Sequence, residues 1–398
     1  MFNLAANIST FVASLLRGHR SSCSQMMTWR GANQMGESMS ITVDTIHLPE
    51  HQRARTAIAA RLVKLLASFL VAIAPLLAFT STAARACACG CSVFDAGFGG
   101  LPQEDEHGGR IFFEWWHSDQ NRLMAGTSTI SHDANVDKRI NTSWYSIGAQ
   151  YMFNRDWGFM ARLPYATRDF ATVDRDSGIL NNFHANDFGD LELMGMYTGF
   201  SKDLSTGVIF GVKLPTGNYT AHGFDRDTAL GTGSTDLILG GFHRGLITGD
   251  NAWQYFTQIR GLFPFLYRSS INPDTGTSQL YKPGYQIDGS AGIVYNNGYN
   301  ILGFDKIAPL VQVIGSHRVR DGGEFSDPLN SGFDRLMIAP GIEFTKVLDE
   351  ANKRVAKFYF DVEVPFYYRV NAGVRDDGAV LGQLTAPVMF KAIASYNF

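Results

Sequence analysis

Apolar and polar positions alternate along most of the chain from Gly108 onward. Successive side chains of a strand point to opposite faces, so a period of two predicts strands with one apolar and one polar face. The pattern predicts twelve strands, at 109–119, 139–153, 157–169, 188–199, 205–216, 233–246, 251–263, 285–296, 304–318, 333–347, 355–370 and 385–398. They are longer than the ~5–6 residues usual in globular proteins and long enough for tilted strands that span a membrane.

The connections between these segments alternate in length. Those after the even-numbered segments are short, such as Asn154–Asp156 and Phe200–Leu204, whereas those after the odd-numbered segments are long, such as Phe170–Asp187 and Gly217–Thr232. Tight turns at one rim and long loops at the other are typical of an outer-membrane barrel. A Greek-key sandwich does not sort its loops in this way. We therefore expect an all-β protein, a closed antiparallel up-and-down transmembrane β-barrel of about twelve strands.

Aromatic residues strengthen this expectation. Near the short connections we expect an aromatic girdle at one membrane interface, formed by Tyr151, Phe153, Trp157, Phe200, Trp253, Tyr295, Tyr299, Phe344 and Phe358. The last segment ends with Tyr396 and a terminal Phe398, and so resembles the closing strand of bacterial outer-membrane barrels, where it is the assembly signal. The expected partners are outer-membrane lipid and, through Phe398, the barrel-assembly machinery. We expect this strand to pair with the first, near Arg110–Asp119.

The amino-terminal part has the order of a secretory signal. An apolar run, Leu65–Phe79, follows several basic residues and precedes Ala84-Arg85-Ala86, a small-x-small cleavage site. We expect a mis-annotated extension at 1–38, a signal peptide at 39–86, a periplasmic or lumen segment at 87–108 and the barrel at 109–398. A soluble amphipathic helix is the alternative for the apolar run.

Three cysteines open the expected mature chain. Cys87, Cys89 and Cys91 form the sequence C-A-C-G-C. Closely spaced thiols favour a soft metal such as Cu(I) or Zn(II), although the spacing differs from the C-x₂-C of structural zinc sites. A disulfide, within the cluster or with another chain, is the alternative in an oxidising periplasm. A lipid anchor on Cys87 is a further alternative.

Composition excludes several classes. The net charge of −3 offers no electrostatic basis for nucleic-acid binding, and the mature region has no apolar run near the ~18 residues of a membrane helix. No metalloprotease motif, nucleophile elbow or P-loop occurs. His117 is next to Ser118, and Ser316 is next to His317, but adjacent strand residues point to opposite faces. We therefore expect no enzyme and no cofactor beyond the soft metal.

Three stretches carry a family resemblance. They read G-D-L-E-L-M-G at Gly189–Gly195, G-V-K-L-P-T-G at Gly211–Gly217 and G-T-G-S-T-D-L-I-L-G-G-F-H-R-G at Gly231–Gly245. In these the chain resembles the outer-membrane proteins of the meta-pathway phenol-degradation family, related to fatty-acid and aromatic-hydrocarbon channels. The resemblance implies passage of small, often hydrophobic molecules. The C-A-C-G-C segment departs from the family pattern.

Together these observations predict an outer-membrane channel for facilitated diffusion of a small hydrophobic or aromatic solute. We expect both termini to be periplasmic and 87–108 to plug part of the lumen. The expected lumen residues are Glu114, Arg162, Lys213, Arg260, Asp361, Glu363 and Lys391. Their mixed signs argue against strong ion selectivity. The rival hypotheses are a non-transporting barrel, whose thiols bind metal or anchor a periplasmic partner, and an outer-membrane hydrolase.

Overall fold

The computed structural model describes residues 108–132, 136–174, 177–272, 276–296, 302–374 and 380–398. All of them belong to the second of two compact units of the chain, Thr80–Phe398. The expected signal peptide and the three cysteines lie outside the described residues. Among the residues described, no helix has the length and apolar character needed to cross a membrane.

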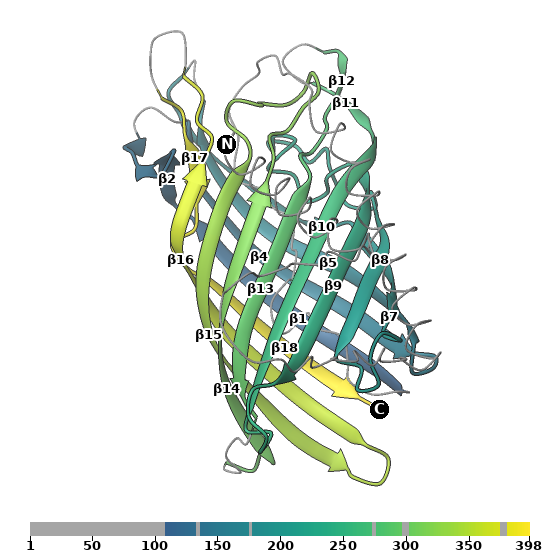
Figure 1. Ribbon diagram of the computed structural model, residues 1–398. Helices are drawn as coiled ribbons and strands as arrows, with labels where there is room; N and C mark the ends of the chain where they lie inside the picture. The colour runs from purple at the N-terminus through teal and green to yellow at the C-terminus, as the bar shows by residue number, and fades with distance from the viewer. Residues whose placement is uncertain (1–107, 133–135, 175–176, 273–275, 297–301, 375–379) are drawn as a thin grey trace, which may run out of the picture. The chain divides into compact units, whose positions relative to one another are not determined.

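Twelve antiparallel strands close into a barrel, which confirms the predicted fold class (Figure 1). Each strand pairs with its neighbours in the chain, and β1 pairs with β18 to complete the ring. The strands are β1 (Gly108–Gln120), β4 (Asp137–Met152), β5 (Trp157–Val173), β7 (Leu191–Tyr197), β8 (Thr206–Leu214), β9 (Ser234–Leu246), β10 (Trp253–Tyr267), β13 (Gln286–Tyr295), β14 (Lys306–Arg318), β15 (Phe333–Asp349), β16 (Arg354–Val370) and β18 (Met389–Asn397). Each predicted segment overlaps one of them.

The seam between the first and last strands lies where the sequence places it. The register runs from Arg110 opposite Asn397 to Ser118 opposite Met389. Beyond it, the amide of Gly109 donates to the carbonyl of Phe398 at 2.7 Å. The ladder therefore continues to the last described residue, and the β1–β18 seam leaves no open sheet edge.

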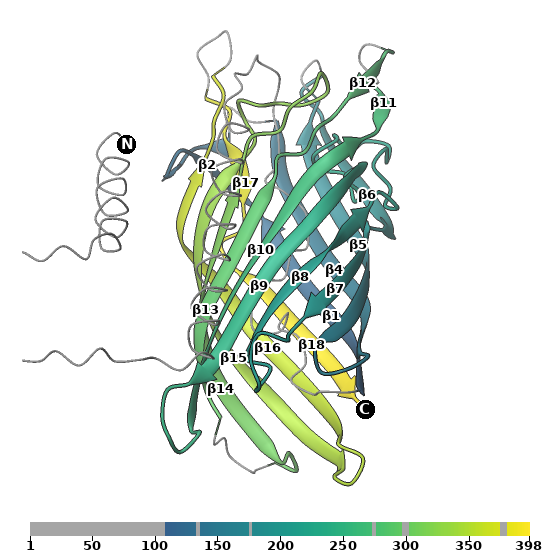
Figure 2. The same ribbon diagram turned by 45° about the vertical axis from the view of Figure 1, so that its right-hand side comes forward.

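Short turns and long loops gather at opposite rims, as predicted. The turns at 153–156, 198–205, 247–252 and 350–353 lie at the rim that also holds the carboxy terminus. The other rim carries the long connections and most of the minor strands (Figure 2). The minor strands are β2 (Arg122–Ala125), β3 (Ser128–Thr129), β6 (Leu180–Phe188), β11 (Ser269–Ile271), β12 (Ser278–Leu280) and β17 (Gln383–Thr385).

One predicted strand, 188–199, is interrupted. The structure divides this region at Gly189 and Asp190 into β6, which pairs with the far half of β5, and β7, which pairs with its near half. The sequence analysis expected a loop where β6 lies. The break has a physical cause, because the Asp190 carboxylate turns inward and accepts hydrogen bonds from the amides of Gly217 and Thr232, at 3.0 Å each.

The outer face of the barrel is apolar. Large hydrophobic side chains such as Ile147, 66% exposed, and Ile259, 58% exposed, lie on it. Near the short turns, Trp157 lies 4.8 Å from Tyr197 and Trp253 lies 5.0 Å from Tyr295, ring centre to ring centre. These aromatic pairs occupy the place of the predicted girdle, of which Tyr299 lies outside the described residues. The buried core lies on the inner face, as a membrane-spanning barrel requires.

Candidate functional site

Buried ion pairs line the middle of the lumen. Arg162 of β5 contacts Glu114 of β1 and lies 3.8 Å from Glu192 of β7, which accepts a 2.8 Å bond from Arg260 of β10. We call these four residues the ion-pair belt. Every member is at most 6% exposed. Because removal of one partner from a buried pair leaves an uncompensated charge, each member of the belt is expected to matter for stability.

Two further charged groups extend this pattern around the lumen. Lys213 of β8 bridges Asp190 and Asp236, at 2.8 Å and 3.0 Å. On the other side of the β1–β18 seam, Lys391 lies 3.0 Å from Glu363. Positive and negative side chains thus alternate along the wall. The wall is polar, but its electrostatic potential is not dominated by one sign of charge.

The structure places all seven expected lumen residues on the inner face, none more than 6% exposed. Arg162 binds Glu114 and is joined to Arg260 through Glu192. Lys391 pairs with Glu363, and Asp361 accepts a 2.9 Å hydrogen bond from Gln312. The sequence analysis missed Glu192, Asp190 and Asp236, which bind these cations. The alternation of apolar and polar residues on β7 indicates that Glu192 faces the lumen. It does not indicate the pairing with Arg260, because β7 and β10 are not neighbouring strands.

The long β8–β9 loop, residues 215–233, packs against the inner wall near the long-loop rim. Arg168 of β5 is fully buried and donates to the carbonyls of Thr228 and Ala229. Within the loop, Arg226 donates to the carbonyl of Thr232 at 3.0 Å. Burial lowers the pKa of the Arg226 guanidinium, an effect opposed by the nearby Tyr281. These bonds hold the loop in one position and narrow the lumen.

At the base of this loop, the backbones of two glycines, Gly217 and Gly231, lie in close contact. The amide of Gly231 donates to the carbonyl of Asn218 at 2.8 Å. A β-carbon on Gly231 would lie 2.5 Å from the carbonyl carbon of Gly217, closer than real atoms approach. The close crossing of the two backbones therefore requires glycine at this position.

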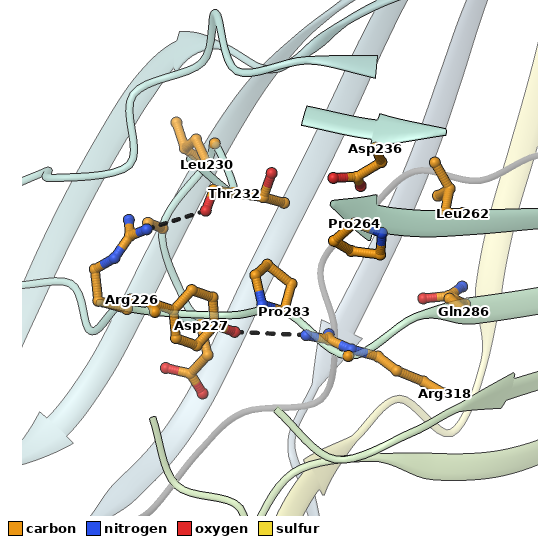
Figure 3. Close-up of a pocket in the computed structure, with 14 residues that line it drawn as sticks. Arg226, Asp227, Leu230, Thr232, Asp236, Leu262, Pro264, Pro283, Gln286 and Arg318 are labelled. Atoms are coloured by element: carbon orange, nitrogen blue, oxygen red, sulfur yellow. Dashed lines mark hydrogen bonds between the residues drawn. The ribbon is translucent and has the colours of Figure 1, made fainter. Parts of the chain in front are cut away.

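Two cavities flank the loop. The smaller, about 40 Å³, lies between the loop and the ends of β9, β10 and β14 (Figure 3). Arg226 and Arg318 project toward it from opposite sides, and Arg318 contacts Tyr281. The larger, 570 Å³, is a vestibule near the long-loop rim. Its wall combines aromatic rings with carboxylates, including Phe170, Phe183, Phe224, Asp225, Asp227 and Glu324.

Toward the short-turn rim, the lumen wall changes from charged to apolar. Buried side chains of ten barrel strands pack as one cluster there, with Phe112 of β1 against it. We call this cluster the apolar collar. Its members are Met152, Met160, Met194, Met196, Ile209, Ile238, Phe242, Phe256, Leu262, Val294, Ala308, Leu310, Tyr359 and Ile393. The sequence analysis missed the collar, since each strand contributes only one or two of its residues and alternation does not report height along the barrel.

The histidines of the hydrolase alternative have other partners. His117 Nδ1 lies 2.9 Å from Ser143 Oγ across the β1–β4 ladder, while Ser118 is buried on the opposite face. Asp119, two residues along the His117 face, is bound by Arg139 at 2.7 Å. His317 binds Asp334 rather than Ser316. Among the described residues, no group of three or more His, Cys, Asp or Glu side chains could hold a metal ion.

Comparison with known proteins supports the fold. No family model matches the chain, and no curated protein matches it. The COG4313 outer membrane channel from Pseudomonas putida F1 is similar in structure, with 10% sequence identity, a TM-score of 0.51, and coverage of 77% of this chain and 100% of that one. The β-domain of the Bordetella autotransporter Brka has 12% identity and a TM-score of 0.42, covering 74% of this chain and 100% of that one. The class is thus a twelve-stranded outer-membrane-type β-barrel.

Proposed function

We propose that this protein is a channel of the bacterial outer membrane that carries a small hydrophobic or aromatic solute by facilitated diffusion. The observation that carries the proposal is the sorting of side chains, with an exposed apolar exterior and a buried, ion-paired interior around a closed ring. A barrel of this size has a narrow interior that side chains can largely fill, so passage is selective. The vestibule of 570 Å³ is large enough to hold a solute of one aromatic ring.

The orientation forms part of the proposal. Outer-membrane barrels turn short connections to the periplasm and long loops outward. Both ends of the barrel, Gly108 and Phe398, lie at the short-turn rim and are therefore assigned to the periplasm. Labelling of single cysteines placed in the β8–β9 loop and in the 350–353 turn tests this. Labelling of the turn alone in intact cells would contradict it.

The segment 87–108 is proposed to enter the lumen as a partial plug. It precedes β1 directly, so its end is held at the short-turn mouth. The test is conductance in planar bilayers, with the mature protein and a variant that lacks Cys87–Glu106. The proposal expects reproducible channel steps that become larger in the deletion variant. A barrel that stays closed in both forms would favour a non-transporting protein.

The non-transporting alternative rests on the cysteines. If Cys87, Cys89 and Cys91 bind a soft metal, a triple Cys-to-Ser variant should lose the metal found by elemental analysis. Unchanged metal content would exclude that role. Turnover of outer-membrane phospholipid by the purified protein tests the hydrolase alternative.

A further inference from the structure

The inner wall is layered along the barrel axis. On several strands, two successive inward-facing residues change from apolar to charged in the direction of the long loops. The pairs are Phe112 and Glu114 on β1, Met160 and Arg162 on β5, Met194 and Glu192 on β7, and Ile393 and Lys391 on β18. On these four strands the apolar collar and the ion-pair belt are therefore two successive layers of the lumen wall, whereas on β10 the collar extends past Arg260 to Leu262.

The wall becomes polar again on the other side of the collar. Arg110 of β1 and Arg244 of β9 follow Phe112 and Phe242 toward the short turns, and Lys357 of β16 follows Tyr359. The collar is thus an apolar layer between two charged ones. Its fourteen buried members are at most 8% exposed.

An apolar layer in a channel discriminates between strongly hydrated solutes and apolar ones. A charged or strongly polar solute must lose its water there without gaining hydrogen bonds, which is costly, and hydrophobic constrictions exclude ions by losing their own water. An apolar solute is stabilised there, because its surface is removed from water. The charged layer on the long-loop side does not reverse this order, since its charges are paired with one another.

We propose that the apolar collar is the selectivity filter of the channel, and that it admits uncharged apolar solutes and excludes ions and hydrated solutes. This inference rests on the proposed channel function. It names the residues that select the solute, whereas the ion-pair belt shapes the wall without selecting by charge.

Four methionines make one side of the collar adaptable. Met160 and Met194 are direct cross-strand partners on β5 and β7. Beside them, Met152 and Met196 meet over Gly158, whose missing β-carbon would lie 2.3 Å from Met152 Sδ and 2.8 Å from Met196 Cε. Methionine is unbranched and repacks at low cost. These side chains can move aside for a ring-sized solute and return afterwards.

The test uses two dyes with one skeleton, the uncharged N-phenyl-1-naphthylamine and its sulfonated analogue 8-anilino-1-naphthalenesulfonate. Entry of each dye is followed by fluorescence in cells that express the full chain, with conductance in KCl measured on purified protein. Three double variants are compared. Met160→Gln with Met194→Gln adds polarity at nearly constant volume, Met160→Leu with Met194→Leu is the apolar match, and Met160→Ala with Met194→Ala removes bulk. Heat-dependent migration on gels verifies that each barrel is folded.

The wild type and the Leu variant should admit the uncharged dye and give reproducible but small conductance steps. The Gln variant should raise conductance and entry of the sulfonated dye by about tenfold. If the Ala variant opens as far as the Gln variant, or the Gln variant behaves like the Leu variant, the collar is not a filter of this kind. Equal entry of both dyes through the wild type would also overturn it. Absence of conductance and of dye entry in every variant would overturn the channel function itself.

Discussion

The ring of Phe398 lies directly over Gly109, across the seam that closes the barrel. A β-carbon on Gly109 would be 2.5 Å from Cζ of that ring. The two residues also exchange backbone hydrogen bonds of 2.7 and 2.9 Å. The space left by glycine thus lets the last aromatic side chain lie flat on the outer face, where it stacks 5.9 Å from Tyr396.

Replacement of Gly109 tests this contact. Gly109→Val should displace the Phe398 ring, weaken the seam and lower the yield of folded barrel. The measurement is the fraction of protein that shows heat-dependent migration after refolding into detergent. Gly249→Val is a suitable control, because nothing lies within 4 Å of a β-carbon there. Equal yields of the two variants would show that the Phe398 ring needs no space at Gly109.

The ion-pair belt should contribute strongly to stability. Glu192→Ala leaves Arg260 buried without its 2.8 Å partner and removes a neighbour of Arg162. Loss of one member of a buried pair typically costs ~3–5 kcal/mol. We expect a loss of this order in the free energy of unfolding, measured by denaturant titration in detergent.

An exposed pair provides the comparison for the belt. Lys346 lies 3.4 Å from Asp305 near the short-turn rim, with both side chains well exposed. Lys346→Ala should cost less than ~1 kcal/mol, as surface pairs do. If both substitutions cost the same, the lumen around Glu192 is wetter than its burial indicates.

The β8–β9 loop should be released by a larger residue at its base. Gly231→Val places atoms where the Gly217 backbone lies, so the loop must leave the inner wall. We expect faster proteolytic cleavage within 215–233 and larger conductance steps, with the barrel still folded. Cleavage at the wild-type rate would contradict the inward packing of the loop. Gly249→Val again serves as the control.

The methionine contact over Gly158 offers a milder change to the collar. Gly158→Ala brings a methyl group toward Met152 Sδ and Met196 Cε, the flexible ends of both side chains. We expect the barrel to fold and the entry of uncharged dye to fall, because the methionines are pushed into the lumen. Gly289→Ala is the matched control, with its nearest neighbour at 3.4 Å. Unchanged dye entry would place the solute path away from these two side chains.

The sequence by itself determined the class of fold and the face of each strand residue. The two-residue period of the sequence predicts the face of the sheet on which Arg162 lies. The alternation of short and long connections predicts that the strands form a meander. Chain order alone therefore predicted a seam between the first and last strands. These are local properties, since each depends on residues close together in the chain.

Only the tertiary structure decided which side chains meet across the lumen. The partners Glu192 and Arg260 lie on strands separated by two others, and the collar draws on ten strands, from β4 to β18. The height of a residue along the barrel depends on the register of every pair in the ring, which alternation does not encode. The inward β8–β9 loop likewise depends on Arg168 and Asp190, two distant side chains whose burial is satisfied only when the barrel has closed around them.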